Sequence, residues 1–102
     1  MIQHIVMFKF SEEADGRSKE ENLKMACDLA GELLPPIETM KGMQVVTNAK
    51  DADGTNYDFA LICMFDDMEG LNAYQVHPKH VEFGGFIKKV REARACIDFE
   101  VP

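Results

Sequence analysis

The segment Tyr74-Gln75-Val76-His77-Pro78-Lys79-His80 combines a helix break with two of the three histidines and one of the two tyrosines of the chain. Pro78 disfavours the α conformation at His77, so a helix that enters this segment should end near Val76. Pro78 can then open a second helix, because its missing N–H has no intrahelical partner at that position. The segment therefore predicts two successive helices that meet at His77.

His80 falls in the first turn of the second predicted helix. The positive end of the helix dipole disfavours an imidazolium there and favours the neutral ring, which can act as a base. His77 has a simpler explanation as the residue that caps the turn before Pro78. We therefore expect any chemistry to centre on His80.

Length and composition indicate one globular domain over residues 1–102, with 46% hydrophobic residues. The formal net charge of −7 argues against nucleic acid or an anionic membrane as a partner. The longest apolar run, over 59–65, is too short to cross a bilayer, and the first residues lack the charged start of a secretory signal. These features predict a cytoplasmic protein.

No metal or cofactor is expected from the spacing of the reactive residues. Cys27, Cys63 and Cys96 are far apart and lie among apolar neighbours, which is typical of reduced cysteines that pack as small hydrophobes. The pair His77 and His80 lacks a cysteine or carboxylate at ligand spacing, so it is a weak zinc signal. The acidic loop over 48–56 lacks the terminal glutamate of a calcium loop, and no phosphate-binding or dinucleotide motif is present.

The hydrophobic pattern predicts the order β-α-β-β-α-β, the ferredoxin-like arrangement of the α+β class. Ser18 followed by Glu21 has the form of a capping box, and Pro35-Pro36 ends the helix that follows it. Asp66 followed by Glu69 is expected to start the next helix. Strands are expected over 2–10, 43–48, 57–65 and 93–101, and helices over 18–34, 66–76 and from 78 onward.

The first and third predicted strands are apolar on both faces, although the helices of such a fold cover only one face of the sheet. Ile5, Met7, Ile62 and Met64 would all face water in a monomer. At roughly 1.5–3 kcal/mol per large buried side chain, leaving these four in water forgoes on the order of 6–12 kcal/mol. A second copy that stacks its sheet on the first would cover them, so we predict a homodimer of the α/β-barrel type.

Four motifs together resemble the stress-responsive dimeric α/β-barrel (Dabb) family. The motifs are Met1-Ile2-x-His4-Ile5-Val6-x-Phe8-Lys9-Phe10, Tyr57-Asp58-x-Ala60-Leu61, Phe65-Asp66-Asp67 and Tyr74-x-Val76-His77-Pro78-x-His80. The resemblance implies a dimeric ferredoxin-like barrel. Most members are small stress-linked proteins, and one plant branch is a polyketide cyclase that closes a ring without a cofactor.

The resemblance to the cyclase branch implies that His4, Tyr74 and His80 line a pocket. The cyclase has a further histidine in the third strand, where this chain has Phe59. The tyrosine in the first helix of the cyclase is replaced here by a non-aromatic residue near position 25 or 26. The pocket of this chain therefore departs from the cyclase pattern at two positions.

We expect one cavity between sheet and helices, with His80 as a base and Tyr74 or His4 as a hydrogen-bond donor to an enolate oxygen. The expected apolar lining is Val6, Phe8, Phe59, Leu61 and Phe83. The alternative is structural: His4 and His80 bond to each other or to the backbone and fix how the second helix docks.

Three functions remain open from the sequence. The first is a dimeric stress-protective or binding module for a small apolar or polyketide-like ligand. The second is a cofactor-free cyclase, isomerase or lyase that uses His80. The third is a cofactor-independent monooxygenase or a haem-binding degrading enzyme, both of which occur among other barrels of this topology.

Overall fold

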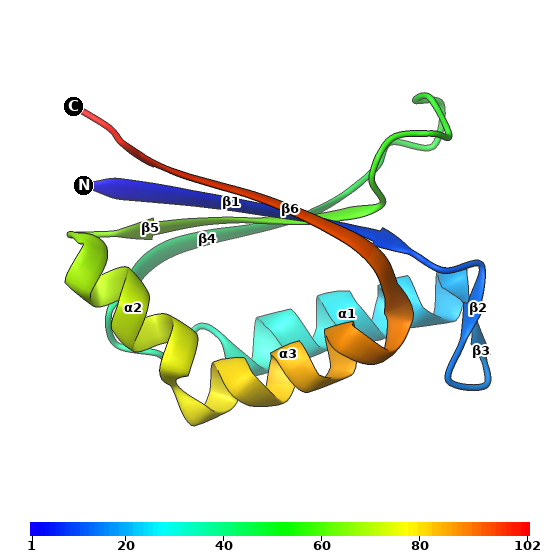
Figure 1. Ribbon diagram of the computed structural model, residues 1–102, viewed down its shortest axis with the longest axis horizontal. Coiled ribbons are helices and arrows are strands. Elements are labelled where there is room, and N and C mark those ends of the chain that lie inside the picture. The colour runs from blue at the N-terminus through cyan, green and yellow to red at the C-terminus, as the bar shows by residue number, and fades with distance from the viewer.

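The computed structural model describes residues 1–102. Figure 1 shows one long, twisted sheet with all three helices on the same side of it. The four main strands are antiparallel in the order β4-β5-β1-β6, so the predicted β-α-β-β-α-β plan is confirmed. The main elements are β1 (Ile2–Phe10), α1 (Lys19–Leu33), β4 (Met40–Thr47), β5 (Phe59–Phe65), α2 (Met68–Val76), α3 (Pro78–Val90) and β6 (Arg91–Glu100).

The helix ends follow from local sequence. The backbone N–H of Glu21 donates to Ser18 Oγ (3.2 Å) and that of Ser18 donates to Glu21 Oε1 (3.0 Å), which completes the predicted capping box. His77 ends α2 and caps α3, where its Nδ1 accepts from the Lys79 N–H at 3.1 Å, as predicted. The expectation that Asp66 opens α2 is wrong, because Asp67 is the cap and its Oδ1 accepts from the Gly70 N–H.

The connection between β1 and α1 contains two short strands that were not among the predicted elements. A two-residue hairpin pairs β2 (Glu13–Ala14) with β3 (Arg17–Ser18). Asp15 and Gly16 occupy its turn with φ angles of 54° and 77°. Aspartate and glycine are the residue types that adopt positive φ most readily, and they are favoured in such tight turns.

Strand pairing shifts three of the predicted strand bounds. β4 and β6 begin earlier than expected, because Met40 pairs with Phe65 and Arg91 pairs with Phe10. β5 begins at Phe59, and the preceding residue, Asp58, bonds to β1 twice: its backbone N–H donates to the Phe8 carbonyl at 3.0 Å and its carboxylate accepts from the Phe10 N–H at 2.8 Å. Asp58 thereby fixes the end of β1 against the start of β5.

The core lies between the sheet and the helices. Alternate residues of β1, including His4, Val6 and Phe8, point into it, as predicted from the period of the strand. Phe59 lies at its centre, with its ring 6.0–6.4 Å from the rings of three other phenylalanines: Phe8, Phe10 and Phe83. These packed aromatic rings fill part of the core between the sheet and the helices.

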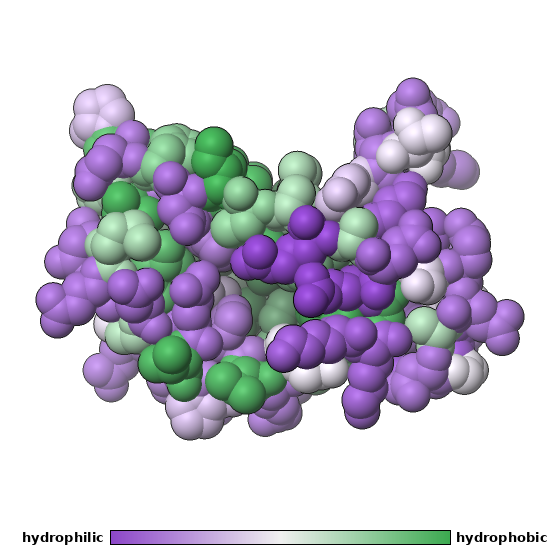
Figure 2. All heavy atoms as spheres, viewed as in Figure 1, coloured by the Kyte–Doolittle hydropathy of each residue, from purple (hydrophilic) through white to green (hydrophobic).

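The other face of the sheet is apolar and carries no helix. Ile5 on β1 pairs with Ile62 on β5 and with Ile97 on β6, so three isoleucines form a row across the sheet. Ile97 is 59% exposed and Met7 is 39% exposed. The loop between β4 and β5 rises on this same side (Figure 1), and Figure 2 shows hydrophobic side chains gathered above the sheet near the chain termini. None of the helices is long and apolar enough to span a membrane.

Candidate functional site

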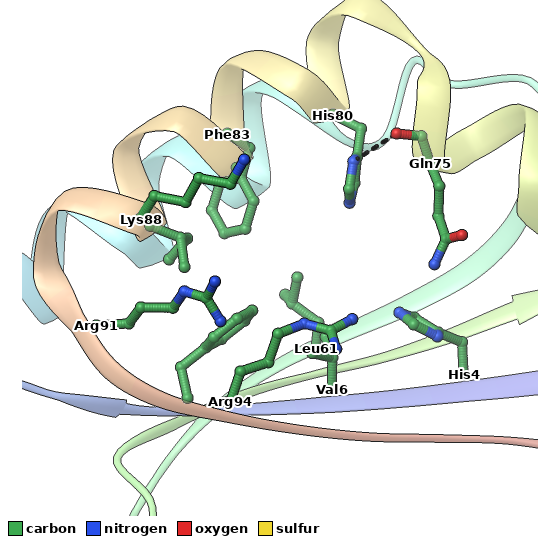
Figure 3. Close-up of a pocket in the computed structure, with 12 residues that line it drawn as sticks. His4, Val6, Leu61, Gln75, His80, Phe83, Lys88, Arg91 and Arg94 are labelled. Carbon is green, nitrogen blue, oxygen red and sulfur yellow. Dashed lines mark hydrogen bonds between the residues drawn. The ribbon is translucent and has the colours of Figure 1, made fainter.

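A cavity of about 180 Å³ lies between the helix-covered face of the sheet and the α2–α3 layer. Figure 3 shows its side chains converging from above and below, and Figure 2 shows a hollow between β6 and these helices with strongly hydrophilic residues at its edge. Five elements contribute to the lining: β1, β5, α2, α3 and the start of β6. The lining residues are His4, Val6, Phe8, Leu61, Gln75, His80, Phe83, Gly84, Ile87, Lys88, Arg91 and Arg94.

The apolar part of the lining largely matches the sequence-based expectation. Val6 and Phe8 rise from β1, Leu61 from β5, and Phe83 descends from α3. Phe59, which was expected here as well, is 2% exposed and lies one layer deeper, where its ring packs against Phe8 and Phe83. It supports the wall of the cavity and does not line it.

His80 projects into the cavity at the start of α3 (Figure 3). Its Nδ1 lies 3.1 Å from the carbonyl oxygen of Gln75. A carbonyl only accepts hydrogen bonds, so Nδ1 carries the proton and the neutral ring keeps a lone pair on Nε2. Burial lowers the pKa of His80 below its ordinary 6.5. The hydrogen bond to Gln75 opposes this shift in part, and the charge of Arg94 adds a smaller effect in the same direction as burial. His80 is therefore neutral at pH 7.

Tyr74 lies between the two histidines of the site. Its ring centroid is 4.6 Å from that of His80 and 6.4 Å from that of His4. The side chain is fully buried, lies outside the cavity lining, and has no hydrogen-bond partner for its hydroxyl. Burial raises the pKa of Tyr74 far above its ordinary value, with the neighbouring Cys63 as a smaller cause. The structure thus brings His4, Tyr74 and His80 together, with Tyr74 as a packed spacer.

The substitution Tyr74→Phe is expected to raise the free energy of unfolding by about 1–3 kcal/mol, because it removes a buried hydroxyl that lacks a partner and leaves the ring in place. Urea denaturation at fixed protein concentration measures the change. Tyr57→Phe, at a half-buried loop position, is the matched control and should change stability by less than about 0.5 kcal/mol. A loss of stability in Tyr74→Phe would show that the hydroxyl has a partner in solution.

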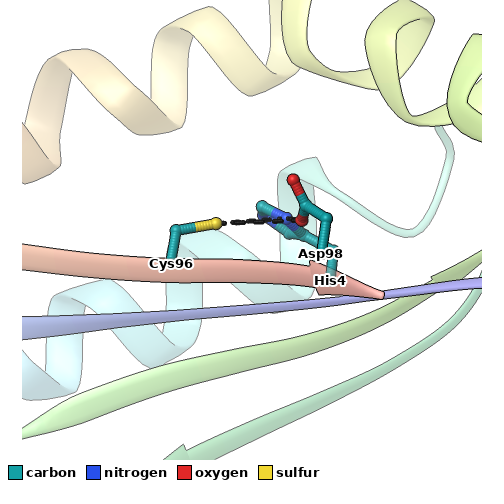
Figure 4. Close-up of side chains that lie close together, drawn as sticks. All are labelled: His4, Cys96 and Asp98. Carbon is teal, nitrogen blue, oxygen red and sulfur yellow. Dashed lines mark hydrogen bonds and ion pairs between the residues drawn. The ribbon is translucent and has the colours of Figure 1, made fainter. Parts of the chain in front are cut away.

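His4 is buried on β1, and its Nδ1 faces two side chains of β6. Nδ1 donates to Asp98 Oδ1 at 2.5 Å, and the Cys96 sulfur lies 3.5 Å from the same nitrogen (Figure 4). The three residues come together because β1 and β6 are neighbours in the sheet with His4 opposite Asp98. Sequence reasoning missed this cluster, since its members are 92 and 94 positions apart. The hydrogen bond from His4 to Asp98 also differs from the structural alternative, in which His4 bonds to His80 or to the backbone.

Comparison with known proteins identifies the family. The model of the "Stress responsive A/B Barrel Domain" family, Dabb, matches residues 2–101, which is nearly the whole chain. The chain is a Dabb domain. This confirms the resemblance drawn from the four sequence motifs.

Relatives of this Dabb domain include a characterised enzyme and structures of unknown function. It is 26% identical to olivetolic acid cyclase of Cannabis sativa over 98 residues, which is 96% of this chain and 94% of the cyclase. A dimeric ferredoxin-like protein of unknown function from Bacteroides fragilis is 31% identical, with a TM-score of 0.79 over 98% of this chain and 95% of that one. A similar dimeric protein from Thermobifida fusca is 26% identical, with a TM-score of 0.84 over 98% and 90%. The ferredoxin-like fold is confirmed.

In this Dabb domain, three cationic side chains that sequence reasoning did not select also line the cavity: Lys88, Arg91 and Arg94. None of them has a carboxylate within 4 Å, although acidic residues outnumber basic ones by 18 to 11 in the chain. His80, Gly84 and Lys88 are spaced four residues apart and so share one face of α3, and this periodicity was the available sequence signal. Arg91 is the first residue of β6. Arg94 is placed by strand pairing alone.

Proposed function

We propose that this Dabb domain binds a small organic acid with an apolar body. The observation that supports this proposal is the charge of the cavity lining, which contains three unpaired cations, two histidines and no carboxylate. The guanidinium groups of Arg91 and Arg94 present planar donor forks that suit a carboxylate. The wall formed by Val6, Phe8 and Leu61 suits an aromatic or aliphatic portion of the same ligand.

The overall charge of the protein strengthens this proposal. Acidic residues outnumber basic ones over the chain, which has a net charge of −7, so three cations and no carboxylate around one cavity reverse the sign of charge locally. They are unpaired at a position where a bound anion would satisfy them. A polyketide-like acid is one ligand with this chemistry, and the relation to olivetolic acid cyclase supports that class.

The substitution Arg94→Gln is expected to weaken binding of a small aromatic carboxylate by about 10–100-fold, because hydrogen bonds to charged groups contribute about 1.5–3 kcal/mol. Isothermal titration with benzoate and hydroxybenzoates, and with the corresponding neutral amides, measures it. The amides should lose little affinity in the same variant.

Adjacent residues on α3 provide the control for this experiment. Lys88→Gln should also weaken carboxylate binding, whereas Lys89→Gln, which removes the same charge one residue further along, should not, since Lys89 does not line the cavity. Equal affinity for the acid and its amide in the unmodified protein would contradict the proposal.

A second function, cofactor-free proton transfer, is favoured by the geometry of His80. The fixed Nδ1–H leaves Nε2 as the free base, and the lowered pKa keeps it neutral at pH 7. Nε2 would take a proton from a carbon next to a carbonyl of the bound ligand. The cations would stabilise the enolate that forms, as donors do at developing oxyanions. Hydrogen exchange at that carbon, followed by NMR in D₂O, is the direct measurement.

We further infer that the domain acts as a homodimer. The uncovered face carries the row Ile62, Ile5 and Ile97, and exposed large side chains on an uncovered sheet face typically mark a contact. Met7 and Val46, which are about 40% exposed, extend this surface toward the β4–β5 loop. The related proteins from Bacteroides fragilis and Thermobifida fusca are dimeric, which supports the same assembly here.

A further inference from the structure

The cluster of His4, Cys96 and Asp98 offers one nitrogen, one sulfur and one oxygen from adjacent strands (Figure 4). These three donor atoms all lie within 4.8 Å of one another. They are neighbours because β6 alternates: Cys96 and Asp98 are two residues apart and so point to the same side of the sheet as their partner His4. The set is thus formed by two rigid strands and by no mobile loop.

Two of the three distances between the donor atoms are close to those expected in a tetrahedral zinc site. Zinc bonds of about 2.3 Å to sulfur and 2.0–2.1 Å to nitrogen and oxygen place the sulfur about 3.5 Å from each of the other ligands. The observed distances from the Cys96 sulfur are 3.5 Å to His4 Nδ1 and 3.8 Å to Asp98 Oδ1. The third distance, from His4 Nδ1 to Asp98 Oδ1, is 2.5 Å because a hydrogen bond joins these atoms. A metal in place of this proton would increase the distance to about 3.3 Å.

We propose that His4, Cys96 and Asp98 form a binding site for a divalent transition metal, with zinc as the best fit. Imidazole and thiolate ligands favour zinc over magnesium or calcium, and a set of three protein ligands leaves a fourth position open for water or a ligand oxygen. On binding, the Cys96 thiol loses its proton to solvent, and the His4 ring changes tautomer, with its proton on Nε2, so that neutral Nδ1 can bind the metal. The two negative ligands, Cys96 and Asp98, then balance the two positive charges of the ion.

This inference reverses the expectation of no metal, which rested on ligand spacing along the chain. Spacing detects ligands that lie on one hairpin or helix, and this set joins the first strand to the last. The site borders the cavity, because His4 belongs to both. The metal proposal does not depend on the proposed ligand, since binding is measured with the ion alone.

Cobalt(II) is the probe, since it takes the tetrahedral geometry of zinc and is coloured. Titration of the metal-free protein with Co²⁺ is expected to give one ion per chain, visible bands of tetrahedral cobalt and a near-ultraviolet band from the thiolate. Zinc should displace the cobalt. Cys96→Ala should abolish the near-ultraviolet band and weaken binding by at least about tenfold, and Asp98→Asn should weaken it similarly.

Two controls make the outcome decisive. Cys27→Ala removes a half-buried cysteine of α1 outside the cluster and should leave the cobalt spectrum unchanged. Cys96 is exposed, so Cys96→Ala should fold normally, which circular dichroism checks. Failure to bind Co²⁺ or Zn²⁺ at micromolar concentrations would overturn the proposal, as would binding by Cys96→Ala with the same spectrum and affinity as the unmodified protein.

Discussion

Replacement of His80 by asparagine is expected to slow catalysed hydrogen exchange next to a ligand carbonyl by about 10²–10⁴-fold, the usual contribution of a positioned general base. The asparagine amide can still donate to the Gln75 carbonyl, as Nδ1 of the histidine does at 3.1 Å, so the start of α3 should remain folded. What disappears is Nε2, the one basic atom that the histidine presents to the cavity. NMR of a small β-keto acid in D₂O, with and without each variant, measures the rate.

The neighbouring histidine supplies the control for this experiment. His77 caps α3 through its side chain, and asparagine is also a good cap, so His77→Asn should preserve both structure and exchange rate. The pH dependence is a second check: because burial lowers the pKa of His80, the rate should fall on acidification with a midpoint below pH 6.5, the ordinary pKa of histidine. A rate in His80→Asn equal to that of the unmodified protein would rule out His80 as the base and leave binding as the function.

Ile97→Lys is expected to dissociate the proposed homodimer. Ile97 is 59% exposed in the single chain, so lysine there should be tolerated by the fold itself, whereas in the dimer it would place an unpaired charge in an apolar contact. An unpaired buried charge costs about 3–5 kcal/mol, and two-fold symmetry places two such charges in the contact. The dissociation constant should rise by at least about 10²-fold. Sedimentation velocity should then show the 11.5 kDa chain in place of a particle of twice that mass.

Val81 gives a matched control for surface hydrophobicity. It is also 59% exposed, but it lies on α3, on the helix side of the molecule. Val81→Lys should therefore leave the oligomeric state unchanged. If Ile97→Lys remained as associated as the unmodified protein, the uncovered sheet face would not be the dimer contact.

The sequence by itself determined the features that depend on local geometry. Pro78 separated two helices, Ser18 and Glu21 formed a capping box, and the period of β1 placed His4 on the same face as Val6. Each of these follows from residues within about four positions of one another, where steric and hydrogen-bonding preferences act directly. The two-sided apolar pattern of the first and third strands, together with the predicted element order, likewise predicted an apolar face that the helices do not cover.

Only the tertiary structure decided which long-range neighbours the site contains. Side chains alternate along β6, so the strand has a polar row that includes Asp98 and an apolar row that includes Ile97. The pairing of His4 with Asp98 determined that the polar row faces the helices and that Ile97 faces outward. The same pairing brought Arg94 to the cavity and Cys96 to His4. Side chains alternate along a strand with a period of two, whichever strands pair with it. The sequence of one strand therefore cannot specify which of its two rows faces the helices. That choice depends on the register between strands that are more than 80 residues apart in the chain.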